Sequence, residues 1–257
     1  MIGRRACTLL FFAASLAALA SLDGCRRWRS HGAQLRREHA ANDPNALHVA
    51  HVTAPITIDG ELDEEPWRTV VVRSGPLVAA NGAPGRPHSD ARLFWAGDAL
   101  YLGLYAADGD LRGSDATRIG DAFHVELSRG KDVYSIDVDI SGVLKEQARH
   151  GGAVDASWRS GAKIGHEADG TIKPRAGGSA PKKENAEEGE DGDEEWVLEL
   201  AVPLASIGAK PVKGESFGIV VRRCDVSATS DAPNAPVVEN PCSTWGTAAR
   251  PKALVLD

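Results

Sequence analysis

From residue 49 onward the chain is a series of short apolar runs separated by glycine, aspartate and proline. Within many of these runs, hydrophobic positions alternate with polar ones, which is typical of strands that bury one face. No long run shows the 3.6-residue period of a helix. Short strands with frequent turn residues predict an all-β protein, specifically an antiparallel β-sandwich.

The clearest pattern predicts a hairpin. Residues 92–95 and 99–105 flank Ala96-Gly97-Asp98, and the leucines of the second run alternate with its tyrosines and glycine. A short turn with glycine and aspartate joins antiparallel strands. Similar short apolar runs predict further strands at residues 123–127, 134–140, 196–203, 217–224 and 252–256. One helical turn is expected at residues 204–208.

The run from Ile56 to Trp67 is the most informative single segment. Ile56 and Ile58 alternate with polar neighbours, which predicts a half-buried strand. Asp59-Gly60 supplies residues that tolerate a tight reversal of the chain. Trp67 is then expected to return to the core.

The N-terminus has the pattern of a bacterial secretory signal, with Arg4 and Arg5 before the uncharged residues 6–20. Cleavage after Ala18-Leu19-Ala20 is one possibility. The other is a lipobox, Leu22-Asp23-Gly24-Cys25, in which Cys25 carries the lipid, although aspartate is unusual at its position. We favour the lipobox, with residues 1–24 as signal peptide. The protein is then exported and lipid-anchored in the cell envelope, and otherwise periplasmic or secreted.

Two segments lack the apolar residues needed for a packed core. Residues 25–48 are rich in arginine, histidine and alanine, and we expect a basic flexible linker. Its alternative role is contact with anionic lipid headgroups. Residues 177–195 contain eight acids and no large apolar side chain, which predicts a disordered loop. The folded domain is therefore expected to span 49–257.

Composition narrows the function further. Hydrophobic residues make up 42% of the 257 residues and charged residues 25%, as in ordinary globular proteins. The net charge of −7 provides no broad basic face, so nucleic acid is not an expected partner.

The cysteines predict one disulfide. With Cys7 in the signal and Cys25 lipidated, Cys224 and Cys242 remain as a pair. The disulfide closes a loop of about 18 residues, worth about 3 kcal/mol.

Seven segments in this order resemble the family nine carbohydrate-binding modules and their DOMON-like relatives. The segments are ITIDGELDEEPW, ARLFWAGDALYLGLYAADGD, GDAFHVELSRG, VYSIDVDISGVL, DASWRSGAKIGHEADGT, WVLELAVPLASIG and TWGTAARPKALVL. The resemblance covers residues 49–257 and implies an antiparallel β-sandwich of secreted and surface proteins. Members that bind sugar hold a terminal pyranose between two tryptophans.

The resemblance also indicates candidate site residues. Trp245 falls where one tryptophan of the clamp is expected, and Arg118, three residues before Asp121, stands where the other is expected. Arginine can stack on a sugar or bind a carboxylate, so the site could take an acidic sugar or could have lost sugar binding. Trp158, in a polar loop, is a further candidate. Three other tryptophans are expected to be core: Trp67, Trp95 and Trp196.

We do not expect the protein to require a cofactor. Some relatives coordinate calcium, and the acidic turns 59–64 and 108–110 offer oxygen ligands, so calcium is a hypothesis. Haem ligation by methionine is excluded because Met1 is the only methionine and leaves with the signal. No residue set indicates catalysis, since Asp137 and Asp139 fit a solvated strand face better than an acid/base pair.

Together these observations predict a non-enzymatic, lipid-anchored β-sandwich that binds a saccharide end through an aromatic site. The expected ligand-binding residues are Trp245, Arg118, Asp121 and Trp158. One alternative is an envelope lipoprotein that uses the sandwich for protein interaction. Another is an accessory domain of a separate glycoside hydrolase.

Overall fold

The computed structural model describes residues 47–116, 118–173, 182–184, 195–229 and 236–257. All of these belong to one compact unit, Ala40–Asp257. The predicted signal peptide, Cys25, and most of the basic linker and of the acidic loop lie outside the described residues. Leu47 and His48, predicted as the end of the linker, instead belong to the first strand, so the folded domain begins before residue 49. Among the residues described, no helix is long and apolar enough to cross a membrane.

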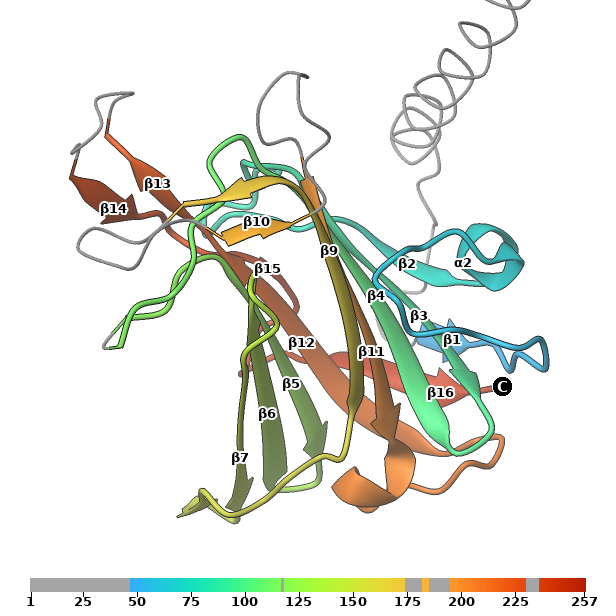
Figure 1. Ribbon diagram of the computed structural model, residues 1–257. Coiled ribbons are helices and arrows are strands. Elements are labelled where there is room, and N and C mark those ends of the chain that lie inside the picture. The colour runs from blue at the N-terminus through green and yellow to red at the C-terminus, as the bar shows by residue number, and fades with distance from the viewer. Residues whose placement is uncertain (1–46, 117, 174–181, 185–194, 230–235) are drawn as a thin grey trace, which may run out of the picture. The chain divides into compact units, whose positions relative to one another are not determined.

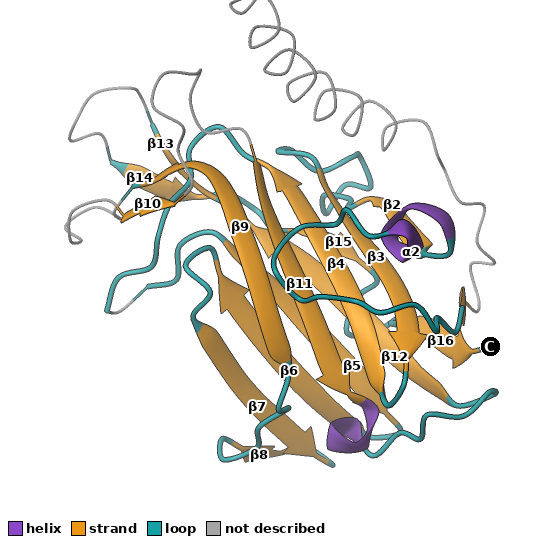
Figure 2. Ribbon diagram, turned by 45° about the vertical axis from the view of Figure 1, so that its right-hand side comes forward, coloured by secondary structure: helices purple, strands orange, loops and turns teal. Residues whose placement is uncertain are grey.

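Two sheets face each other across the core (Figures 1 and 2). The first, sheet A, has the strand order β1-β16-β12-β5-β6-β7-β8, with β15 also paired to β12. Its strands are β1 (Leu47–Val49), β16 (Lys252–Leu256), β12 (Ser216–Cys224), β5 (Ala122–Arg129), β6 (Asp132–Asp139), β7 (Leu144–His150), β8 (Ala153–Asp155) and β15 (Ser243–Trp245).

The second, sheet B, has the order β10-β9-β11-β4-β3-β2. Its strands are β10 (Lys182–Glu184), β9 (Lys163–Ile172), β11 (Glu195–Pro203), β4 (Ala99–Ala107), β3 (Ser89–Ala96) and β2 (Val72–Pro76). A separate ribbon joins β13 (Val226–Ala228) to β14 (Val237–Glu239), and the helical elements are α2 (Glu65–Thr69) and the 3-10 turn η1 (Leu204–Ile207). Neighbouring strands described here are antiparallel, except that β1 runs parallel to β16.

The β-sandwich prediction is confirmed, and the alternating hydrophobic side chains on which it was based fill the core. Every second residue of the central strands points between the sheets, because successive side chains of a strand point to opposite faces. These inward residues include Leu93, Leu100, Leu102, Leu104, Phe123, Val125, Leu127, Ile136, Val138, Trp196, Leu198, Leu200, Ile219 and Val221. The predicted hairpin is present as β3 and β4, with Ala96 opposite Ala99.

The predicted strand at Ile56–Ile58 is wrong. These residues are half-buried but have no sheet partner, and they belong to a segment, residues 52–71, that covers the outer face of sheet B. We call it the cover segment. The outer face of sheet B carries apolar side chains such as Phe94, so another part of the chain must cover this face and bury them. The cover segment does so. Its Trp67, in α2, is fully buried.

Two further predictions can be placed in the fold. Cys224 and Cys242 form a disulfide across 18 positions, which ties the end of β12 to the segment before β15. In the loop expected to be disordered, Lys182–Glu184 instead form β10, paired with β9, and Glu195 begins β11. Backbone hydrogen bonds to an existing strand can order three residues without any apolar side chain.

Candidate functional site

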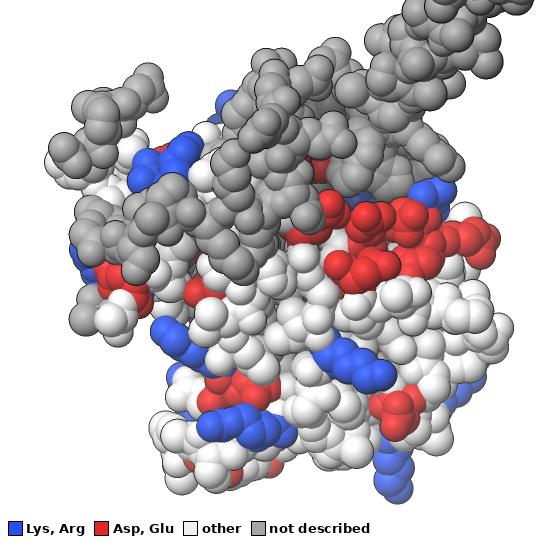
Figure 3. Space-filling model, in the orientation of Figure 1, with Lys and Arg blue, Asp and Glu red and all other residues white. Residues whose placement is uncertain are grey.

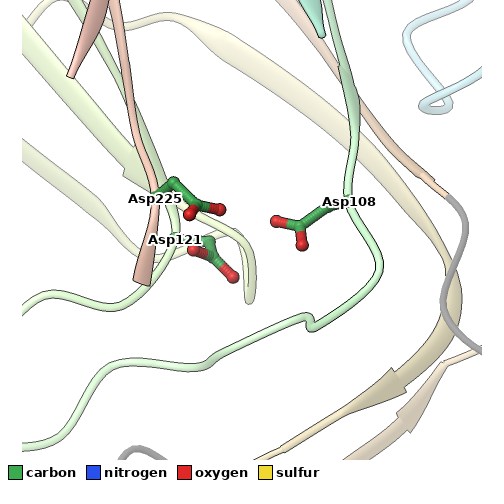
Figure 4. Close-up of side chains that lie close together, drawn as sticks. All are labelled: Asp108, Asp121 and Asp225. Atoms are coloured by element: carbon green, nitrogen blue, oxygen red, sulfur yellow. The ribbon is translucent and has the colours of Figure 1, made fainter. Parts of the chain in front are cut away.

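A buried charged cluster lies at the end of the sandwich where β4 and β12 end and β5 begins. Asp108, Asp121 and Asp225 converge there from three segments far apart in the sequence (Figure 4). Arg223 reaches the same point from β12, where it follows the inward-facing Val221 by two positions. All four charged side chains are at most 7% exposed.

The guanidinium of Arg223 bonds to all three carboxylates. Its Nη2 donates to Asp108 Oδ2, and Nη2 also lies 3.5 Å from Asp225 Oδ1. Its Nη1 lies 3.5 Å from Asp121 Oδ1. The rings of Phe123 and Trp196 lie 6.0 and 5.5 Å from its central carbon. A planar group with five donors suits this arrangement, because one side chain can bond several carboxylates at once.

Asp121 also connects the surrounding backbone. Its Oδ1 accepts the amide of Val226 at 2.8 Å, and its Oδ2 accepts the amide of Arg112 at 2.5 Å. The amide of Ile140 donates to its carbonyl at 2.9 Å. Because these bonds join β5, β13 and the loop after β4, Asp121 stabilises this end of the domain.

Burial changes the titration of two of the aspartates that share the guanidinium of Arg223, namely Asp108 and Asp121. Burial raises the pKa of Asp108 to about 6, although Arg223 opposes the shift. Burial also raises the pKa of Asp121 well above its ordinary value. In the unfolded chain these groups titrate near 4. Between about pH 4 and pH 6, the folded protein therefore holds more protons than the unfolded chain does.

We expect the protein to be more stable at pH 5 than at pH 7. Stability falls with rising pH wherever the folded state binds more protons, and the Asp108 shift corresponds to about 1 kcal/mol over this interval. Urea unfolding at the two pH values measures the difference. In Asp108→Asn the difference should shrink, and equal curves for the wild-type protein at both pH values would contradict the expectation.

The acidic turn 108–110 is a poor fit for calcium. The three clustered aspartates already have a guanidinium among them. Asp110 accepts bonds from Arg112, from Lys173 at 3.2 Å and from the amide of Ala228 at 2.8 Å. These cationic donors use the oxygens that a calcium ion would need.

The structure separates the predicted ligand-binding residues. Trp245, on β15 opposite Val221, packs into the core and is 8% exposed. Arg118 lies in the loop before β5, where its half-exposed side chain pairs with Asp115 at 3.1 Å. Asp121 belongs to the buried cluster. Of Trp245, Arg118 and Asp121, only Arg118 presents its side chain to solvent.

Trp158 lies at the other end of the sandwich. Its ring packs against Tyr134, with centroids 5.2 Å apart, and its Nε1 donates to the carbonyl of Ser206 at 3.1 Å. Tyr134 is opposite Leu127, whereas Asp139 at the far end of β6 is opposite Ala122. Five residues of strand span about 17 Å. A single sugar ring therefore cannot contact both Trp158 and Asp121.

Asp137 and Asp139 have different local partners. Asp137 pairs with His124 on the outer face of sheet A, with 2.9 Å between His124 Nδ1 and Asp137 Oδ1. Asp139 instead accepts the amides of Ser141 and Val143, which closes the turn after β6. Asp137 is partly exposed, but Asp139 is only 5% exposed, so the predicted solvated strand face is wrong for Asp139, whose carboxylate is used in the turn.

Sequence reasoning missed Arg223 as the centre of the buried cluster. The only signal was a pair of arginines at the end of an otherwise apolar run, where alternation places one of the two inside. It also missed Tyr134 as the partner of Trp158. That contact joins segments whose relative register is not visible in a single sequence.

Three solved structures share this fold. A family nine carbohydrate-binding module from Caldicellulosiruptor kristjanssonii in complex with cellotriose is 15% identical, with TM-score 0.51, and covers 83% of this chain and 94% of its own. The same type of module in complex with glucose is 16% identical, with TM-score 0.52, and covers 83% and 96%. A candidate carbohydrate-binding protein from Bacteroides uniformis is 13% identical, with TM-score 0.51, and covers 84% and 100%. No protein-family model and no curated protein matches the sequence.

Proposed function

We propose, from the premise that this chain has the fold of family nine carbohydrate-binding modules, that it binds saccharides without catalysing a reaction on them. The observation that carries the proposal is the likeness over most of the domain to modules in complex with cellotriose and glucose. Fold alone does not define a site, so the site must be argued from this chain's own side chains.

Trp158 is the first candidate for the aromatic contact. A sugar packs its apolar face on an accessible indole. Of the tryptophans in the described ranges, Trp158 alone is partly exposed, since the other four are at most 8% exposed. The hydrogen bond from its Nε1 to Ser206 fixes the ring, and His150 and Arg159 offer polar groups nearby. A ring held in place binds with little loss of side-chain entropy.

Trp245 with Arg118 is the second candidate, as the family resemblance indicates. Arg118 presents a guanidinium that could bond a sugar carboxylate, but a sugar would reach Trp245 only if the indole became more exposed than 8%. The burial of Trp245 also favours the second function, an envelope lipoprotein that keeps the fold and binds protein. In both cases we propose that lipid on Cys25 anchors the protein to the membrane.

Calorimetric titration of the protein with glucose, cello-oligosaccharides and uronate-containing oligosaccharides tests the function. We expect saturable binding that Trp158→Ala weakens at least tenfold, because the stacking surface is lost. Arg118→Gln is the matched variant for the second candidate and should leave this binding unchanged. Loss in Arg118→Gln alone would move the site to Trp245, and no binding across the panel would favour the protein-interaction function.

A further inference from the structure

The loop after β8, residues 155–160, carries the tryptophan that we propose binds saccharides, and polar contacts hold this loop at both ends. Asp155 Oδ1 accepts the amide of Ser157 at 2.9 Å and its hydroxyl at 2.6 Å. At the other end, Glu146 Oε1 accepts the amide of Ser160 at 3.0 Å. A loop bonded in this way is already ordered, so a ligand that binds there loses little affinity to further ordering.

Arg159 belongs to this loop, and the backbone of the loop orients its side chain. Nη1 of Arg159 donates to the carbonyl of Ala156 at 2.8 Å and to that of Trp158 at 2.7 Å. The second carbonyl belongs to the residue that carries the candidate indole. The guanidinium therefore lies beside Trp158, and two hydrogen bonds restrict a side chain that otherwise has many rotamers.

The other donors of Arg159 remain available to a ligand. The side chain is exposed, and among the described residues neither Nε nor Nη2 has a hydrogen-bond partner and no carboxylate pairs with the guanidinium. Nε and Nη2 lie along one edge of the planar group, where their N–H bonds form a fork that fits the two oxygens of a carboxylate. Arg159 thus offers a charged edge with two donors to solvent.

The acids of the adjoining segments have other partners. Asp132 Oδ2 lies 3.4 Å from His150 Nδ1. The hydrogen bonds from Ser157 lower the pKa of Asp155, so this carboxylate is ionised at neutral pH and bonded within its own turn. In the described structure neither acid forms an ion pair with Arg159, whose positive charge remains for a ligand.

The main acidic surface lies away from this loop. Figure 3 shows the largest group of acidic side chains in that view over the cover segment. Figures 1 and 2 place α2 of that segment and β7, which pairs with β8, at opposite sides of the domain. The exposed acids of the cover segment are Asp59, Glu61, Asp63 and Glu65. Because like charges repel, a ligand with a carboxylate is disfavoured at the cover segment but not at Arg159.

We propose, resting on the saccharide-binding function proposed above, that this site selects a uronic acid, whose ring packs on the indole of Trp158 while its carboxylate bonds to Nε and Nη2 of Arg159. A uronate is a pyranose with a carboxylate in place of the hydroxymethyl group. It therefore offers an apolar face to an indole and a planar pair of oxygens to a guanidinium. Bidentate bonds between arginine and carboxylate are stronger and more selective than neutral hydrogen bonds, and a neutral hexose offers only one uncharged hydroxyl at that position.

Calorimetric titration at pH 7.5 with three disaccharides tests this selectivity. They are cellobiose, cellobiouronate, in which a carboxylate replaces the hydroxymethyl group of the non-reducing ring, and the methyl ester of cellobiouronate. We expect cellobiouronate to bind about tenfold more tightly than the other two, or better, because it alone carries a charge for Arg159. Added salt should reduce this preference, since the ion pair is exposed to solvent.

Arg159→Gln should bring the ratio of the affinities for cellobiouronate and cellobiose close to one. Arg149→Gln is the matched control, because Arg149 is an exposed arginine on β7, opposite Val154 of β8, and its ratio should stay as in the wild-type protein. If Arg159→Gln binds neither sugar because the loop has changed, Arg159→Lys takes its place. A lysine can still bond a loop carbonyl but has no planar two-donor edge, so the ratio should fall there as well.

The contrary outcomes distinguish uronate selection from saccharide binding in general. If none of the three disaccharides binds, the proposed function fails and uronate selection fails with it. Equal affinities for all three, a preference that survives in Arg159→Gln, or an equal loss in Arg149→Gln would overturn uronate selection by Arg159 alone. Loss of the preference in Arg118→Gln but not in Arg159→Gln would place the acidic sugar at Arg118 instead.

Discussion

Replacing Arg223 with glutamine is expected to lower the free energy of unfolding by about 3–5 kcal/mol, because it leaves buried carboxylates without their cation. Asp108, Asp121 and Asp225 would then face one another with no guanidinium among them. Their charges can be relieved only by proton uptake, so the loss of stability should be larger at pH 8 than at pH 5. Urea unfolding at both pH values measures the two effects together.

Arg222→Gln is the matched control on the same strand. Arg222 faces outward on β12, where its partly exposed side chain pairs with Glu126 at 2.6 Å. Surface ion pairs contribute about 0–1 kcal/mol, so this variant should unfold nearly as the wild-type protein does. Similar losses for the two variants would show that the buried cluster does not depend on its arginine.

The contrast between these neighbours also shows why the fold could be predicted and the buried cluster could not. Alternation along a strand is a local property, and it assigned the inward rows of β4, β5 and β6 correctly. It also implies that only one of Arg222 and Arg223 points inward. The three aspartates that receive Arg223 come from separate loops, and a single sequence does not reveal which loops meet.

The candidate saccharide-binding residues could likewise be predicted from the sequence only in part. The sequence indicated Trp158 as an accessible tryptophan, and the structure places it as the only partly exposed one among the described residues. It could not indicate that Trp158 and Asp121 lie at opposite ends of the sandwich. That separation depends on the register of β5 and β6, which pairs Tyr134 with Leu127. Ligand contact by any of these residues stays a prediction.

The cover segment was the hardest part to predict from its pattern. Ile56 and Ile58 alternate with polar residues as a strand would, yet they belong to no strand. The backbone of the segment bonds to sheet B at its first residue, where the amide of Val52 donates to the carbonyl of Trp95 at 2.8 Å. Both a strand and an extended cover bury alternate side chains, so periodicity alone does not separate them. The backbones of Gly60 in the segment and Gly165 in β9 lie so close that a Cβ on Gly165 would be 2.6 Å from the amide of Gly60. These two glycines were the only local indication that the segment covers the sheet.

Trp67→Ala should lower the free energy of unfolding by about 3–5 kcal/mol and free the cover segment from sheet B. Trp67 is fully buried, and its ring centroid lies 4.3 Å from that of Phe94. Removing a buried tryptophan loses its transfer free energy and leaves a cavity. The cluster beneath the cover segment contains few other large side chains, with Val52 and Leu62 its remaining buried members from this segment. We expect limited proteolysis within residues 52–71 to become much faster.

The neighbouring substitution Val70→Ala separates this packing effect from local helix stability. Val70 follows α2 and is 42% exposed, so its truncation should cost less than about 0.5 kcal/mol and leave proteolysis unchanged. Glu199, on β11, accepts the amides of Asp59 and Gly60 of the cover segment, each at 2.9 Å. If Trp67→Ala instead loses little stability and the segment stays resistant to protease, these hydrogen bonds hold the cover segment without the tryptophan. In that case its attachment is polar, and Glu199→Gln should have the larger effect of the two.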